Sequence, residues 1–179
     1  HEYALPESVL AVARAGAGTN NIPSEAYAKK GVVVFNTPGA NANAVKELVL
    51  AALFASGRKL AESLEWVRSL AGKGEEIPKL VEKGKKNFVG HELNGKVIGI
   101  IGLGAIGAQV ANATEAIGMT VLGYDPYLSV ENALSLTRKA HRVQSLDELA
   151  AAADYVTVHV PLLADNRGFL NKEFFAKMK

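Results

Sequence analysis

The chain has 179 residues, 49% of them hydrophobic and 21% charged, a globular composition with room for one domain or two incomplete ones. A formal net charge of +2 is too small to argue for nucleic acid, and the absence of cysteine excludes disulfides, thiolate catalysis and cysteine-ligated metals. No apolar run reaches the roughly 20 residues that span a bilayer, and residues 1–6 lack a signal-peptide pattern, so we expect a soluble cytoplasmic protein without a membrane partner.

Two short apolar runs near the N-terminus predict neighbouring strands of a parallel sheet. They cover residues 9–13 and 32–36 and are almost entirely apolar instead of alternating, which favours buried strands. The segment between them opens with Pro23-Ser24-Glu25 and suits a short helix.

Apolar residues at helical spacing then predict one long helix from about Asn43 to Leu70, capped by Asn43 and bent at Gly57. Residues 72–94 are polar and lysine-rich, which predicts a surface stretch and not a core element. Their densest basic run, residues 83–86, contains a glycine and has acidic neighbours. We interpret it as a solvated surface in preference to a phosphate-binding patch.

From residue 97 onward, apolar runs alternate with helical patterns. We predict strands at 97–101, 120–124 and 155–160, and helices at 105–117, at 145–153 with Ser145 as cap, and from Asn171 to the end. This alternation predicts an α/β, Rossmann-like, doubly wound parallel sheet with helices on both faces. About three strands leave an open edge and an uncovered apolar face, so we expect association or marginal folding.

The glycine motif G-x-G-x-x-G lies between the strand at 97–101 and the helix that follows it. Gly102 permits the tight turn, Gly104 lets a pyrophosphate approach the backbone, and Gly107 lets the helix pack closely. The N–H groups of Ala105 and Ile106, at the start of the helix, would then meet the phosphates. A glycine-rich turn used only for packing is the alternative, which the strand–turn–helix context disfavours.

Asp125 ends the next predicted strand, about 20 residues after the glycines, as a dinucleotide fingerprint requires. Its carboxylate would accept hydrogen bonds from the adenosine ribose and would repel a 2′-phosphate. Pro126 and the residues after it offer no arginine, although Arg138 and Arg142 lie further along. The sequence therefore favours NAD over NADP as cofactor.

His159, Val160 and Pro161 end the third predicted strand of this sheet. Because strand ends in such sheets face the ligand crevice, we expect these residues to flank the nicotinamide half of the cofactor. We interpret His159 as a structural histidine in preference to an acid or base.

Together these residues resemble the D-2-hydroxyacid dehydrogenase family. The matching segments, in family order, are residues 13–21, 36–41, 102–107, 124–126 and 154–162. The pairing of Arg14 with the Gly-Ala-Gly loop resembles one branch of the family in particular. That branch oxidises 3-phosphoglycerate, the reaction that opens serine biosynthesis. The resemblance implies part of a flavodoxin-like substrate domain in residues 1–42, and a crossover helix with part of an NAD-binding Rossmann domain in residues 43–179.

The resemblance also implies individual roles. The substrate carboxylate would be held by the backbone N–H groups of a loop formed by Ala15, Gly16, Ala17 and Gly18. Arg14 would add positive charge near a phosphorylated substrate, with a structural salt bridge as the alternative. Thr37 would touch the cofactor near a hinge, and the helix from Asn43 would help to build a homodimer.

The family transfers hydride reversibly between NAD and C2 of a 2-hydroxy acid, which needs a cation and a histidine–carboxylate pair. In relatives the arginine, the acid and the histidine come after the position of Lys179. We therefore expect no catalytic residue and no metal in this chain, and cofactor binding without turnover. The spacing of the remaining candidates does not indicate a group that could replace these catalytic residues. The candidates are Lys46, Glu47, His1, His91 and His141.

Two other functions stay open. One is a dehydrogenase for another 2-hydroxy acid, of the lactate or glyoxylate/hydroxypyruvate type. The other is a non-catalytic NAD-sensing interaction protein, similar to the co-repressor members of the family.

Overall fold

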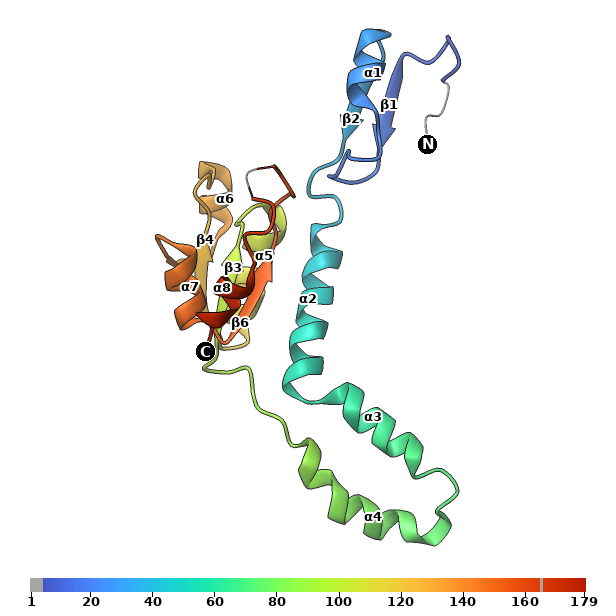
Figure 1. Cartoon of the computed structure of the whole chain (residues 1–179), viewed down its shortest axis with the longest axis vertical. Helices are drawn as coiled ribbons and strands as arrows, with labels where there is room; N and C mark the ends of the chain where they lie inside the picture. The colour runs from blue at the N-terminus through green and yellow to red at the C-terminus, as the bar shows by residue number, and fades with distance from the viewer. Residues whose placement is uncertain (1–4, 165) are drawn as a thin grey trace.

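A computed structural model describes residues 5–164 and 166–179, so His1 lies outside the described residues. A small α/β unit at the N-terminal end leads into helix α2 (Ala42–Gly57), which runs beside a larger α/β unit (Figure 1). Helices α3 (Leu60–Ser69) and α4 (Ile77–Gly84) form an arm that extends from the far end of α2 before the chain returns to the larger unit.

The N-terminal unit pairs β1 (Ala11–Arg14) with β2 (Val33–Asn36) in parallel, and α1 (Ser24–Lys29) connects them. The parallel pairing and the short helix confirm the predictions, but the predicted burial is wrong. Val33 and Phe35 are 52% and 57% exposed. The reason is that α1 packs on one side of the pair, through the buried Tyr27, and no other described element packs extensively on β1 or β2.

The single long helix predicted from Asn43 to Leu70 is two helices. The break falls at Lys59, whose φ of 50° is left-handed, directly after α2 ends at Gly57. The Gly57 carbonyl accepts a hydrogen bond from the His91 N–H at 2.8 Å, which fastens the returning chain to this break. The predicted cap is also wrong, because the Asn43 amide donates to Glu47 Oε1 (2.7 Å) from inside the helix.

Residues 72–94 are exposed for the most part, as predicted, although Leu93 is buried in the core of the larger unit. They contain α4 and two 3₁₀ turns, η1 (Gly74–Glu76) and η2 (Lys85–Phe88). Phe88 stacks on Trp66 of α3 with ring centroids 5.0 Å apart, so the arm has a small aromatic contact of its own.

The larger unit is built on a four-stranded parallel sheet in the order β5-β4-β3-β6, which confirms the doubly wound α/β class. The strands are β3 (Val97–Ile101), β4 (Thr120–Tyr124), β5 (His141–Arg142) and β6 (Tyr155–Val158). The sequence predicted about three strands. The two-residue β5 is too short to give an apolar run, and β6 ends two residues before the predicted end at 160.

Helices cover both faces of this sheet, as predicted. Ile98 and Ile100 of β3 pack toward α5 (Ala105–Ala116), and α2 packs on the outer side of α5. Ile101 packs on the opposite side against α7 (Leu146–Ala152) and α8 (Lys172–Ala176). The predicted cap of α7 is confirmed, because Ser145 Oγ accepts from the Glu148 N–H at 3.1 Å. Helix α8 is shorter than the predicted 171–179.

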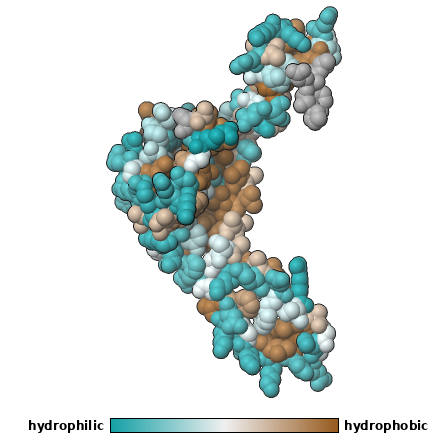
Figure 2. Space-filling model, in the orientation of Figure 1, coloured by the Kyte–Doolittle hydropathy of each residue, from teal (hydrophilic) through white to brown (hydrophobic). Residues whose placement is uncertain are grey.

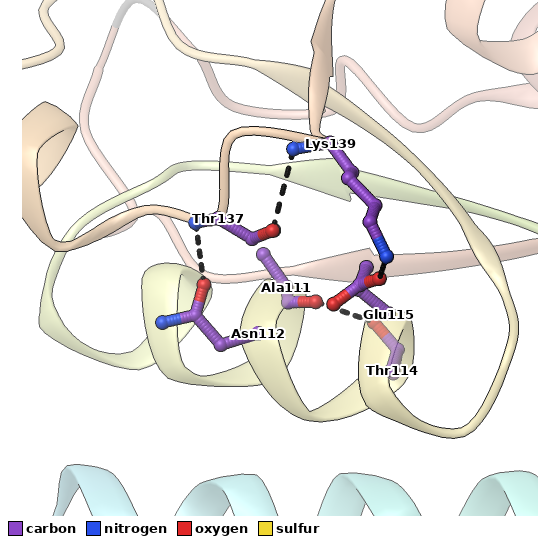
Figure 3. Close-up of polar contacts among 6 residues, drawn as sticks. All are labelled: Ala111, Asn112, Thr114, Glu115, Thr137 and Lys139. Atoms are coloured by element: carbon purple, nitrogen blue, oxygen red, sulfur yellow. Dashed lines mark hydrogen bonds and ion pairs between the residues drawn. The ribbon is translucent and has the colours of Figure 1, made fainter.

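An unpredicted helix, α6 (Val130–Ser135), and the loop after it are tied to α5 by side chains (Figure 3). The Thr137 N–H donates to Asn112 Oδ1 (2.7 Å), and Asn112 Nδ2 donates to the Ser135 carbonyl (2.8 Å). Lys139 forms an ion pair with Glu115 (2.6 Å), which raises the pKa of Lys139. These contacts fix the segment that leads from β4 to the edge strand β5.

Apolar side chains are exposed on α2 and on the arm. Figure 2 shows apolar surface where α2 lies in Figure 1, and the residues include Leu48, which is 71% exposed, and Leu64 of α3, which is 57% exposed. The expectation of an uncovered apolar face on the nucleotide-domain sheet is therefore wrong, because helices cover both faces of that sheet; the exposed apolar residues lie instead on α2, on α3 and on the β1–β2 pair. Among the described residues no helix combines the length and hydrophobicity that a membrane crossing needs.

Candidate functional site

A pocket of about 570 Å³ opens at the carboxyl ends of β3, β4 and β6. This is the edge at which open parallel α/β sheets bind ligands. Seven of the residues that the sequence singled out line it: Gly102, Gly104, Asp125, Pro126, His159, Val160 and Pro161. The rest of the wall comes from Ile101, Tyr124, Tyr127, Asn132, Leu146, Leu163, Asn166 and Phe169.

The three glycines have the geometry that a phosphate-binding turn needs. Gly102 has φ +91°, and a Cβ there would lie 2.8 Å from the His159 carbonyl oxygen. A Cβ at Gly107 would collide with the carbonyl of Gly102, so the helix can pack this closely only with glycine. Gly104 borders the pocket, and a Cβ there would have no atom within 4 Å. The open space over Gly104 is the cradle in which a pyrophosphate fits.

The start of α5 supplies the donors for that cradle. Gly104 is its N-cap residue, and the first intrahelical bond runs from the Ala108 N–H to the Gly104 carbonyl at 2.9 Å. The N–H groups of Ala105 and Ile106 precede that bond and have no partner within the helix. They therefore point out of the helix N-terminus, where the helix dipole also favours negative charge.

Asp125 is held at the mouth of the pocket by two backbone donors. Its Oδ2 accepts from the Leu103 N–H and its Oδ1 from the Tyr127 N–H, both at 2.8 Å. Each carboxylate oxygen keeps a further acceptor position for a ribose hydroxyl. Among the described pocket residues there is no arginine, and Arg138 and Arg142 lie outside the lining, so the pocket offers no cation to a 2′-phosphate.

His159 is anchored next to the glycine turn. Its N–H donates to the Ile101 carbonyl (2.7 Å), and its Nε2 lies 3.0 Å from Thr157 Oγ1. Burial lowers the pKa of His159, which keeps the imidazole neutral near pH 7. Val160 and Pro161 continue the same wall. All three line the same pocket as Asp125, and their predicted contact with the nicotinamide half stays a prediction.

The Thr37 side chain is hydrogen-bonded to the backbone of the predicted substrate loop. Thr37 Oγ1 accepts from the Gly16 N–H (2.7 Å) and donates to the Arg14 carbonyl (3.3 Å), and Thr37 does not line the pocket. The Gly16 N–H is therefore not available to a substrate carboxylate, and the predicted role rests on Ala15, Ala17 and Gly18. The adjacent Gly39 nevertheless borders the cofactor turn, because a Cβ there would lie 3.5 Å from Ala105 Cβ.

The Arg14 side chain folds back over the same loop, since a Cβ at Gly16 would lie 2.5 Å from Arg14 Nη1. None of the ion pairs between described residues includes Arg14, so the alternative of a structural salt bridge finds no partner there. The guanidinium is thus placed next to the loop that is predicted to bind the substrate.

The other candidate side chains do not assemble a proton-transfer site within the described part of the chain. No described histidine is hydrogen-bonded to a carboxylate: His91 Nε2 contacts the Tyr155 hydroxyl at 2.6 Å, and His159 contacts Thr157. Lys46 and Glu47 both bind Asn43. His141 is exposed on β5, and no group of three metal-ligating side chains was found in residues 5–164 and 166–179.

Sequence reasoning missed half of the pocket wall. Tyr127 comes two residues after Asp125, so its position just after a strand end was the available signal, whereas Asn132 lies seven residues after Asp125 on the unpredicted α6. Leu163, Asn166 and Phe169 belong to the turn after β6, where the Asn166 side chain accepts from the Leu163 N–H and donates to the Pro161 carbonyl, both at 2.8 Å. Nothing in their residue types indicated this turn in advance.

A glycine turn between β3 and α5, an acidic residue at the end of β4 and a parallel sheet covered on both faces define a dinucleotide-binding domain of the Rossmann class. Residues 50–179 match the family model described as "D-isomer specific 2-hydroxyacid dehydrogenase, NAD binding domain". The chain belongs to this family, and NAD is its cofactor.

Individual relatives agree with the family match. The chain is 38% identical over 173 residues to the D-3-phosphoglycerate dehydrogenases of Methanocaldococcus jannaschii and Rattus norvegicus, which covers 97% of this chain and 30% of each relative. The holo form of Rhodotorula graminis D-mandelate dehydrogenase superposes with a TM-score of 0.78 at 33% identity, over 98% of this chain and 50% of that one. NAD⁺-bound 3-phosphoglycerate dehydrogenase of Entamoeba histolytica gives 0.70 at 31%, over 97% and 46%.

The chain thus spans about 30% of the length of the curated relatives it matches.

Proposed function

We propose that this chain forms the NAD-binding part, and a portion of the substrate-binding part, of an enzyme that oxidises 3-phosphoglycerate. The observation that carries the proposal is the pocket in which the open face of Gly104, the start of α5 and the Asp125 carboxylate meet. NAD, when bound, accepts the hydride from C2 of the hydroxy acid. The similarity to D-3-phosphoglycerate dehydrogenases supports the choice of substrate.

The residues of the chain divide the work of holding NAD. The N–H groups of Ala105 and Ile106 bind the pyrophosphate over Gly104, where no side chain keeps it away. Asp125 orients the adenosine ribose, and its negative charge selects against a 2′-phosphate. Together with the other residues that line the pocket, they would hold the nucleotide in place.

Arg14 supports an anionic substrate. Its guanidinium folds over the loop at residues 15–18, and a planar fork of donors is well suited to a carboxylate or a phosphate. A second substrate class stays open for the same site, because solved relatives include a D-mandelate dehydrogenase and a glyoxylate reductase. Those substrates lack the phosphate, so they would give Arg14 one anionic group fewer.

We further propose that the chain alone binds NAD without turning over substrate. Reduction or oxidation at C2 requires a group that takes the hydroxyl proton, commonly a histidine oriented by a carboxylate. Among the described residues neither His91 nor His159 has such a partner. We also propose a homodimer in which the exposed apolar residues of α2 and α3, among them Leu48 and Leu64, pack against a second copy.

Thermal unfolding of the chain with added ligands tests the substrate assignment. A ligand that binds only the folded state raises the midpoint in proportion to the logarithm of its concentration over Kd. We expect NADH to raise it more than NADPH does, and 3-phosphoglycerate to raise it further in the presence of NAD⁺. Arg14→Gln should remove the second effect and keep the first, whereas an equal response to D-lactate and 3-phosphoglycerate would favour the other substrate class.

A further inference from the structure

Asn132 is a polar residue of the cofactor pocket whose side chain has no role within the protein. It lies on α6, seven residues after Asp125. It is half-buried and lines the pocket with Tyr127 and Pro126. Its backbone N–H donates to Ser129 Oγ (3.2 Å), and its carbonyl accepts from Ser135 Oγ (2.8 Å). The carboxamide itself makes no hydrogen bond to any residue that the structure describes.

The other amide of the pocket shows the contrast. The Asn166 carboxamide uses both ends on the backbone, at Leu163 and Pro161, and so has a structural role. Asn112, on the neighbouring α5, likewise uses both ends, on Thr137 and Ser135. Half-buried amides are usually paired, so one that borders a ligand pocket with both its donors and its acceptor unused is available to the ligand.

We infer that the Asn132 carboxamide recognises the adenine base of the cofactor. The glycine turn accounts for the phosphates and Asp125 for the ribose, and the base is the part of adenosine attached to that ribose. An asparagine side chain can accept from the N6 amino group of adenine while it donates to the adjacent ring nitrogen N7. The inference rests on NAD binding in this pocket and adds a residue that sets which base is accepted.

The position of α6 explains how the amide is held toward the base. The Ser129 hydroxyl caps the first turn, and Asn112 fastens Ser135 and Thr137 at the far end of α6 to α5. Asn132 lies between these two attachments. The helix is therefore fixed at both ends, which limits the conformational freedom that the amide loses when it binds a base.

Isothermal titration of the 179-residue chain with two nucleotides tests the inference. AMP carries the N6 amino group, and purine riboside 5′-monophosphate differs from it only in lacking that group. We expect AMP to bind the wild-type chain roughly tenfold more tightly, the low end of the discrimination that such an amide–adenine pair gives. In Asn132→Leu, which keeps a similar volume without the amide, the two nucleotides should bind with nearly equal Kd.

The matched control is Leu134→Ala, on the same helix but 83% exposed and outside the pocket lining, which should keep the tenfold ratio. Circular dichroism should report the same helix content and unfolding midpoint for all three chains. A ratio near one in wild type, or a tenfold ratio that survives in Asn132→Leu, would overturn the role of Asn132 while leaving NAD binding intact. Failure of both nucleotides and of NADH to bind wild type would overturn the cofactor site together with the inference.

Discussion

Gly104→Thr separates cofactor binding from folding. Gly104 has φ −70° and ψ −164°, an extended conformation that threonine adopts readily, and a Cβ there meets no atom within 4 Å. The residue is the N-cap of α5, a position where threonine is about as favourable as glycine. We therefore expect the free energy of unfolding to change by no more than about 0.5 kcal/mol.

Binding of NADH should respond very differently. The new side chain fills the space over residue 104 and keeps the pyrophosphate away from the N–H groups of Ala105 and Ile106. A hydrogen bond to a charged group contributes about 1.5–3 kcal/mol. The loss of one such bond weakens binding by roughly ten- to 150-fold, and the loss of a second weakens it further.

Gly107→Ala is the matched variant with the opposite outcome. Its Cβ would collide with the Gly102 carbonyl, which belongs to the backbone and cannot move aside without disturbing the turn. Overpacking of this kind costs about 1–3 kcal/mol, and each kcal/mol lowers the unfolding midpoint of a chain this size by about 2–4 °C. Isothermal titration with NADH and thermal unfolding by circular dichroism measure the two effects. The reasoning fails if Gly104→Thr binds NADH within twofold of wild type, or if Gly107→Ala unfolds at the wild-type midpoint.

Three further predictions concern stability and association. Burial lowers the pKa of His159, so the unfolded state takes up a proton more readily than the folded state does. The free energy of unfolding should therefore decrease as pH falls through about 6.5. In urea titrations His159→Gln should flatten this pH dependence, and an unchanged pH dependence would contradict the assignment to His159. Asn112→Ala removes two hydrogen bonds, to Ser135 and to Thr137, and should lower the free energy of unfolding by about 1–2 kcal/mol. In Asn43→Ala the free energy of unfolding should hardly change, because the Asn43 amide contacts only exposed side chains. Equal urea midpoints for the two variants would refute this. Leu48→Glu should shift the chain from dimer to monomer in sedimentation velocity, while Leu134→Glu, at a more exposed leucine on α6, should not; a monomeric wild type would exclude the proposed interface.

The parts of the fold that sequence predicted well are those with a strong local signal. Residues 97–124 contain a continuous apolar strand, the G-x-G-x-x-G motif and a second strand, and the structure has both strands at the predicted residues. The Ser145 cap was equally predictable from the sequence, because a capping residue and the helix that it starts are neighbours in the chain. Helical periodicity predicted the extent of α2 and α3 together, and Gly57 predicted a bend where the structure has a complete break.

The errors come from interactions between distant segments. Gly57 marked the place where the long helix bends, but the hydrogen bond from the His91 N–H to the Gly57 carbonyl joins segments far apart in sequence, which no local pattern contains. The burial predicted for residues 33–36 failed because apolarity shows that a strand can be buried, not whether another element covers it. A contact between distant segments also decides the Thr37 hydroxyl, which only the folded loop shows bound to the Gly16 N–H; the predicted contact of Thr37 with the cofactor stays a prediction.

The most direct test of the function is a calorimetric titration of the purified chain with NADH, run beside a dehydrogenase assay with NAD⁺ and 3-phosphoglycerate. We predict saturable binding of NADH at one site per chain, weaker binding of NADPH, and no NADH formation in the assay. Absence of NADH binding by a folded chain would contradict the cofactor site built on Gly104, α5 and Asp125. Measurable turnover would contradict the conclusion that the described residues lack a proton-transfer pair.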